Sequence, residues 1–130
     1  GNDNIRWQFV QPLSIHGIVP FGNMFGKRQG IAYAYTEITL TDSSEFVFKI
    51  GSNDGVVCWV NKNLVHSNLD VGRALKLDED TFRAILKKGK NSILLKVPNV
   101  GGNWEACLRI NNSYDKPVDL MPFANSMKIK

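Results

Sequence analysis

The chain has 130 residues, of which 43% are hydrophobic and 22% are charged, a composition typical of one soluble globular domain. No apolar run approaches the roughly 20 residues that a membrane-spanning helix needs, so we expect no membrane insertion. The net charge is +4 and the basic residues are scattered along the sequence. Because phosphate-driven binding needs clustered cations, we expect no nucleic-acid partner.

The sequence contains two cysteines, Cys58 and Cys107, and no secretory signal. Two cysteines cannot form a disulfide framework, and these two lack the spacing of a zinc site. The alternation described below places Cys58 on a buried face and Cys107 on the opposite face, so we expect both thiols to be reduced and unpaired. Gly1 before Asn2 resembles a cleavage scar, and we expect the chain to be part of a longer protein.

The N-terminal part has little regular pattern. Residues 5–10 are compatible with a strand, whereas residues 12–30 contain four glycines and two prolines, which favours a loop. From residue 33 onward the dominant period is two, which is typical of strands with one buried face. The strands predicted from this alternation cover residues 33–40, 45–50, 56–60, 64–66, 91–97 and 104–110.

The alternation also predicts which side chains face the core. The inward set is Ala34, Thr36, Ile38, Leu40, Phe46, Phe48, Ile50, Val56, Cys58, Val60, Ile93, Leu95, Val97, Trp104, Ala106, Leu108 and Ile110. Val57 and Trp59 then face outward. Turn-forming residues separate the strands at short intervals, as in Ser52-Asn53-Asp54-Gly55. This spacing predicts an antiparallel sandwich of two sheets.

Residues 71–90 allow two interpretations. Their apolar residues fall close to a helical stripe, which Asp78 could cap and Gly89 could end. The same residues in a strand would place Phe82, Ala84 and Leu86 on one face. The local pattern alone slightly favours the helix. Residues 111–130 show no steady period, and we expect them to wrap around the outside of the domain.

Residues 31–110 resemble a galactose-binding-like jelly-roll module of secreted bacterial multidomain proteins, which often stands beside glycoside hydrolases. The stretches that carry the resemblance are IAYAYTEI, FKIGSNDGVVCWVNKNLVHSN, GRALKLDEDTFRAILKKGKNSILLKVPN and GGNWEACLRI. The resemblance implies an all-β antiparallel jelly-roll sandwich, with residues 1–130 as one domain and 111–130 as a C-terminal extension. It makes residues 81–86 a strand, against the local helical pattern. It also implies a secreted, periplasmic or cell-surface location.

The sequence departs from that family pattern in three places. Asn53 stands where an aspartate is common, which weakens any acidic metal site. Lys62-Asn63 replaces a glycine-containing hairpin turn. Val57 stands where a polar residue is usual, which makes the outer face of its strand more apolar.

Five residues are candidates for ligand binding: Trp59, Asp54, Asn53, Arg73 and His66. An outward-facing Trp59 could stack on a sugar ring or on a partner protein, or it could lie beneath a terminal segment. Asp54 is a weak calcium candidate, because a single carboxylate is a poor site for that ion. The alternative is that Asp54 caps its own turn and Gly55 supplies a positive φ angle. Arg73 could pair with Asp54 in a structural salt bridge or contact a ligand.

The sequence contains no recognisable catalytic constellation. His16 and His66 lie in unrelated contexts, and no nucleophile elbow, Walker loop or dinucleotide fingerprint occurs. The contiguous Asp78-Glu79-Asp80 cannot flank a scissile bond and is better explained as solvated turn charges. We therefore expect no catalytic residues and no cofactor, with calcium as an open alternative.

These patterns lead to three hypotheses about function. The first is a non-catalytic accessory module of a larger secreted protein that binds a glycan, beside a catalytic domain of the parent protein. The second is a structural spacer without a ligand, whose apolar outer face packs on adjacent domains of the parent chain. The third, a small hydrolase, is remote.

Overall fold

The computed structural model describes residues 8–9, 18–26, 29–69, 73–118 and 127–129. One short helix occurs in this part of the chain, and the rest of its regular structure is β. The elements are β1 (Gln8–Phe9), α1 (Phe21–Phe25), β2 (Gly30–Leu40), β3 (Ser44–Ser52), β4 (Val56–Val60), β5 (Asn63–Asn68), β6 (Asp80–Leu86), β7 (Gly89–Asn99), β8 (Ala106–Asn112) and β9 (Met127–Ile129). No helix in these ranges has the length and apolarity that crossing a membrane requires.

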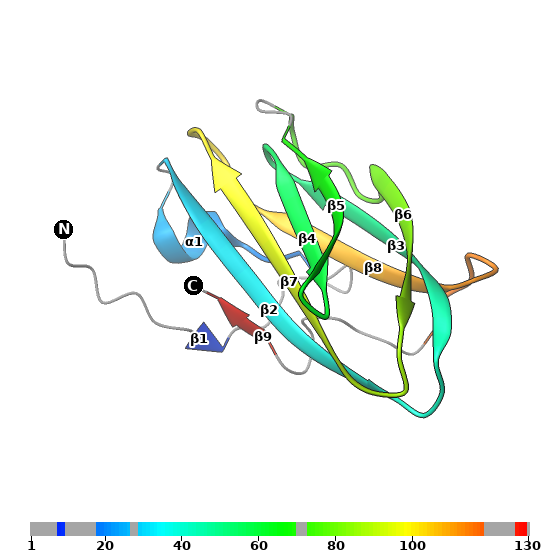
Figure 1. The fold of residues 1–130 in the computed structure, drawn as a ribbon. Coiled ribbons are helices and arrows are strands. Elements are labelled where there is room, and N and C mark those ends of the chain that lie inside the picture. The colour runs from blue at the N-terminus through cyan, green and yellow to red at the C-terminus, as the bar shows by residue number, and fades with distance from the viewer. Residues whose placement is uncertain (1–7, 10–17, 27–28, 70–72, 119–126, 130) are drawn as a thin grey trace.

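The strands form two sheets that face each other (Figure 1). The larger sheet has the order β1-β9-β2-β7-β4-β5 and the smaller one the order β6-β3-β8. Every pair of neighbouring strands is antiparallel. The predicted all-β antiparallel sandwich is therefore confirmed.

The core lies between the sheets and consists of the side chains that the two-residue alternation selects. Phe48, Ile50, Leu95 and Ile110 are almost completely buried and belong to one apolar cluster. The inward faces predicted for five of the strands are confirmed: each of their residues is buried, except Leu40, which is partly buried and packs against the cluster. Strand periodicity thus determines which residues form the hydrophobic core.

Residues 81–86 form a strand, as the resemblance implies, and the local helical pattern is misleading. In β6, Phe82 lies opposite Phe48 of β3, and their ring centroids are 5.2 Å apart. Ala84 and Leu86 of the same strand are buried in the core cluster. Pairing with β3 in the same sheet and burial of one face in the core outweigh the weak helical preference of the segment.

The terminal parts of the chain hold more regular structure than the sequence predicts. Within residues 12–30, the described part includes α1, whose Phe21 is buried and packs on Trp104 with 5.9 Å between ring centroids. Only Gln8–Phe9 of the expected strand 5–10 lie among the described residues, and they form β1. Beyond residue 111, Met127–Ile129 form β9, which pairs with both β1 and β2.

Candidate functional site

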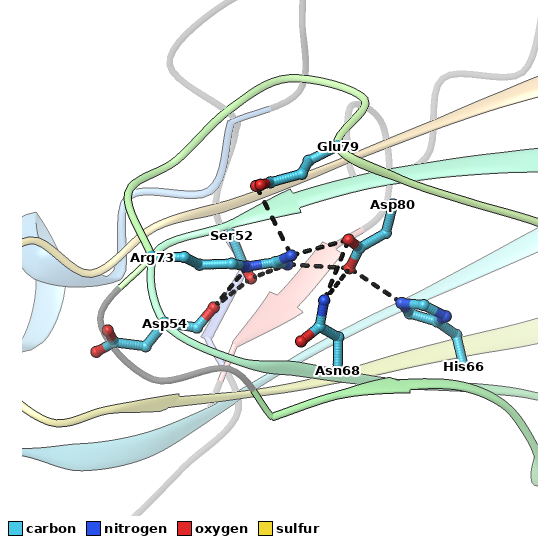
Figure 2. A network of polar contacts seen from close by, with 7 residues as sticks. All are labelled: Ser52, Asp54, His66, Asn68, Arg73, Glu79 and Asp80. Atoms are coloured by element: carbon cyan, nitrogen blue, oxygen red, sulfur yellow. Dashed lines mark hydrogen bonds and ion pairs between the residues drawn. The ribbon is translucent and has the colours of Figure 1, made fainter.

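Four of the five candidate residues lie near one end of the sandwich, and Trp59 lies on a separate face. Asn53 and Asp54 form the turn between β3 and β4, Arg73 precedes β6, and His66 belongs to β5. β5 and β6 are edge strands of different sheets and lie side by side (Figure 1). This arrangement brings Asp54, Arg73 and His66 into one network around Asp80, shown in Figure 2.

Arg73 contacts four residues of the network. Its Nη1 donates to Oδ1 of Asp80 over 2.8 Å, and its Nη2 donates to Oδ2 over 3.0 Å. The same guanidinium donates through Nε to the main-chain oxygen of Asp54 at 3.0 Å and through Nη2 to Oγ of Ser52 at 2.7 Å. Nη1 also lies 3.7 Å from the Glu79 carboxylate. The planar guanidinium joins the β3–β4 turn to the start of β6.

Asp80 receives donors from three directions. His66 Nε2 lies 3.0 Å from Oδ2, and Asn68 Nδ2 donates to Oδ1 over 3.3 Å. Burial acts to raise the pKa of Asp80, but hydrogen bonds from Arg73 and His66 outweigh it and hold that pKa below its ordinary value of 3.8. The His66 ring also stacks on Phe82, with 4.7 Å between centroids. Asp80 is therefore a buried, compensated carboxylate and not the solvated turn charge that the sequence suggested.

Asp54 and Gly55 have roles in the turn that differ from the expected ones. Asp54 itself adopts the positive φ, 63°. Gly55 is needed because of close packing: a Cβ at that position would lie 2.8 Å from the main-chain oxygen of Asn68. The Asp54 carboxylate accepts a hydrogen bond from the main-chain N–H of Val100 at 3.0 Å. Asp54 thus ties its turn to the β7–β8 connection.

These polar residues do not fit a calcium site. Asp54 is buried and one of its carboxylate oxygens already accepts a main-chain hydrogen bond, while the Asn53 amide donates to Glu105. The Asp80 carboxylate already contacts the Arg73 guanidinium, the His66 ring and the Asn68 amide. Across the described ranges, no group of three His, Cys, Asp or Glu side chains is placed to hold a metal ion. Calcium needs six or more oxygen ligands, so we derive no role for it.

The network contains serine, histidine and aspartate, but their order differs from that of a hydrolytic triad. In a triad the histidine lies between the nucleophile and the carboxylate. Here Arg73 lies between Ser52 and Asp80, and His66 contacts Asp80 from the other side. Ser52 is completely buried and its hydroxyl donates to the main-chain oxygen of Asp54 at 2.8 Å. This geometry suits a structural clamp between loops.

The second candidate region is the outer face of the larger sheet. Trp59 of β4 lies opposite Leu94 of β7, and Leu94 lies opposite Tyr35 of β2. On its other side, Trp59 lies opposite Leu64 of β5. Directly opposed residues project to the same face of a sheet, so these four side chains form one row across four strands. We call it the aromatic row: Tyr35, Leu94, Trp59 and Leu64.

The aromatic row reaches the molecular surface. Leu64 is 61% exposed, and Tyr35, Leu94 and Trp59 are partly exposed. The described part of residues 12–30 packs against Trp104 and not against Trp59, because α1 contacts Trp104 through Phe21 and Phe25. Trp104 is the core residue that the sequence predicts, and its Nε1 donates to the main-chain oxygen of Val97 at 2.9 Å.

The outer face of the smaller sheet has a different character. It carries three ion pairs: Lys49 with Asp115, Arg83 with Glu45, and Arg109 with Asp78. Its outward-facing Val47 is only 2% exposed and lies between Arg83 and Asn111 of the neighbouring strands. Partly exposed rings therefore occur on the larger sheet, while charged groups cover the smaller one.

The sequence identified Trp59 but missed the residues that accompany it. The alternation already places Tyr33 and Tyr35 on the outward face of their strand. Tyr35 shares a row with Trp59 because β2 and β4 both pair with β7. The register of that pairing cannot be predicted from a local sequence pattern. A scan against protein-family models found no match for the chain, and a search of curated proteins found none either.

Proposed function

We propose that this domain is a non-catalytic carbohydrate-binding module with a jelly-roll sandwich, carried by a larger secreted, periplasmic or cell-surface protein. The observation that carries the proposal is the aromatic row on the larger sheet. Aromatic rings held on a rigid sheet stack on the apolar faces of sugar rings, and the polar tip of a tyrosine can bond a hydroxyl. Trp59 is the central contact of the site and Tyr35 is the second.

The path of the chain supports the jelly-roll assignment. β2 lies in the larger sheet, β3 in the smaller, β4 and β5 in the larger, β6 in the smaller, β7 in the larger and β8 in the smaller (Figure 1). Repeated exchange between two antiparallel sheets is typical of double-sheet jelly rolls. The resemblance of residues 31–110 to galactose-binding-like modules points the same way.

The polar candidates have a supporting role in this proposal. Arg73, Asp80 and His66 fix the loops at one end of the sandwich, and their side chains satisfy one another. Asn53 and Asp54 bond to Glu105 and Val100 on the neighbouring connection. These residues therefore keep the sandwich rigid, and a rigid scaffold lowers the entropy lost when a ligand binds.

Calorimetric titration with glycans selected on a glycan array tests the proposal. We expect Trp59→Ala to weaken binding by about 2 kcal/mol, or roughly thirtyfold, as loss of a central aromatic contact does. Trp59→Phe should retain most of the affinity. The matched control is Tyr114→Ala, which removes an aromatic ring that is 83% exposed and follows β8 of the smaller sheet. Titrations with and without calcium should agree.

The aromatic row also favours the structural spacer as a second candidate function. Leu64 and Leu94 could pack on an adjacent domain of the parent chain as readily as on a sugar. If no glycan produces heat and Trp59→Ala changes nothing in the isolated domain, carbohydrate binding is wrong. The spacer then predicts that Trp59→Ala lowers the unfolding temperature of the parent protein more than that of this domain alone.

A further inference from the structure

The face that carries the aromatic row has an excess of positive charge. Lys96 of β7 lies one row away, opposite Tyr33 of β2 and Val57 of β4. Lys90 lies further along β7, where its ammonium group is 3.2 Å from the Glu37 carboxylate of β2. Glu37 is the one acidic residue that the described strands place on this face, and it also accepts a hydrogen bond from Tyr35. Lys96 makes no ion pair within the described residues.

More lysines gather at one end of the same sheet. The β4–β5 turn carries Lys62, and the β6–β7 turn carries Lys87 and Lys88, all exposed. Asn91 joins the two turns, because its Oδ1 accepts hydrogen bonds from Asn61 Nδ2 and from the main-chain N–H of Lys87, both at 2.9 Å. Residues distant in sequence thus form a basic rim beside the aromatic row.

The spacing suits a chain of sugars that carries charge. Trp59 and Tyr35 are separated by two strand spacings, about 10 Å, which is more than one sugar ring covers. Lys96 is two residues from Leu94 along β7, or about 7 Å. Its ammonium group stands on a flexible four-carbon stem and can reach the edge of a ring stacked on the row.

We propose that the ligand of this face is an acidic polysaccharide with one carboxylate per sugar ring, which stacks on Trp59 and Tyr35 and pairs with Lys96. This inference rests on the carbohydrate-binding function proposed above and specifies its substrate class. Lys96 makes no ion pair within the described residues and stands beside the row, where it can meet the carboxylate that a uronate carries directly on its ring.

Polygalacturonate and its fully methyl-esterified form provide the test, because they share the sugar chain and differ in charge. In calorimetry at low ionic strength, we expect the wild-type domain to bind the acid at least about tenfold more tightly than the ester. Lys96→Gln should reduce that ratio about threefold, the scale of one exposed ion pair, and leave binding of the ester unchanged. Lys116→Gln is the matched control, since Lys116 is exposed on the segment after β8. Added salt should weaken binding of the acid only.

Each other result identifies which idea is wrong. Equal affinity for acid and ester overturns the uronate inference and leaves the carbohydrate-binding function intact. If Lys116→Gln lowers the ratio as much as Lys96→Gln does, the preference comes from net charge and the proposed site is wrong. Preference for dextran sulfate over dextran without preference for polygalacturonate over its ester also overturns the inference. If no glycan in any arm binds, the carbohydrate-binding function itself fails.

Discussion

The guanidinium of Arg73 and the carboxylate of Asp80 meet through two parallel hydrogen bonds of 2.8 and 3.0 Å, and both side chains are more than nine-tenths buried. Arg73 belongs to a loop segment, and Asp80 is the first residue of β6. The pair therefore attaches an irregular segment to the edge of the smaller sheet. Each charge depends on the other, because neither is well solvated.

The first prediction is that removing one member of this pair is costly. Arg73→Gln leaves the Asp80 carboxylate buried without its main counter-charge and should lower the free energy of unfolding by about 3–5 kcal/mol. Arg83→Gln is the control, because Arg83 pairs with Glu45 at an exposed site, and it should cost less than about 1 kcal/mol. Urea unfolding curves measure both changes. Equal losses for the two variants would contradict the structural role of the network.

The second prediction concerns acid. Because its folded-state pKa lies below 3.8 despite the opposing effect of burial, Asp80 binds a proton more readily in the unfolded chain. Its contribution to stability is therefore complete above the unfolded-state pKa and is lost as the pH falls through the lower folded-state pKa. Between pH 5 and about pH 2, the urea midpoint of the wild-type protein should fall more steeply than that of Asp80→Asn.

The comparison with Asp80→Asn is needed because other carboxylates also titrate in this range. The pKa of Asp115 is lowered as well, mainly by hydrogen bonds from Asn111 and Lys49. Both proteins contain Asp115, so its effect cancels in the difference between the two curves. Parallel curves would show that Asp80 gains no stability from its network.

Much of the fold could be predicted from the sequence because burial on one face of a strand leaves a local signal. The alternation around Phe48 and Leu95 identifies both the strands and their inward faces. The roles of Asp80 and Tyr35 leave no such signal. Asp80 stands in an acidic run that resembles a solvated turn, and its burial depends on Arg73 and on His66 of another strand. The place of Tyr35 beside Trp59 depends on pairing between strands distant in sequence.

The third prediction concerns Gly51 on the outer face of β3. A Cβ at this position would collide with the main-chain oxygen of Lys76 and would lie 3.2 Å from Cys107 Sγ. Because a main-chain atom cannot rotate away, Gly51→Ala should destabilise the protein by about 2 kcal/mol or more. Gly22→Ala in α1 is the control, since a Cβ there would meet Trp104 at an ordinary contact distance of 3.5 Å.

Gly22→Ala should be neutral or stabilising by up to about 1 kcal/mol, because alanine is favoured over glycine in a helix. Thermal unfolding followed by circular dichroism measures both variants. A Gly51→Ala protein as stable as Gly22→Ala would mean that the segment around Lys76 can leave the sheet at little cost. The close contact between that segment and β3 would then contribute little to stability.

The last prediction uses the two thiols as reporters of this segment. Cys58 lies in the core, as the alternation predicts, and burial raises its pKa to about 12. Cys107 lies on the opposite face of the smaller sheet, next to Gly51 and the main chain near Lys76, and burial is the main reason that its pKa is raised. Since thiolates are the reactive species, neither cysteine should react with a thiol reagent in the native wild-type protein at neutral pH.

Arg73→Gln should loosen the segment and accelerate labelling of Cys107 while Cys58 stays protected until global unfolding. Peptide mapping by mass spectrometry separates the two sites, and equal acceleration at both would show that the variant unfolds globally instead of opening at the Arg73 segment.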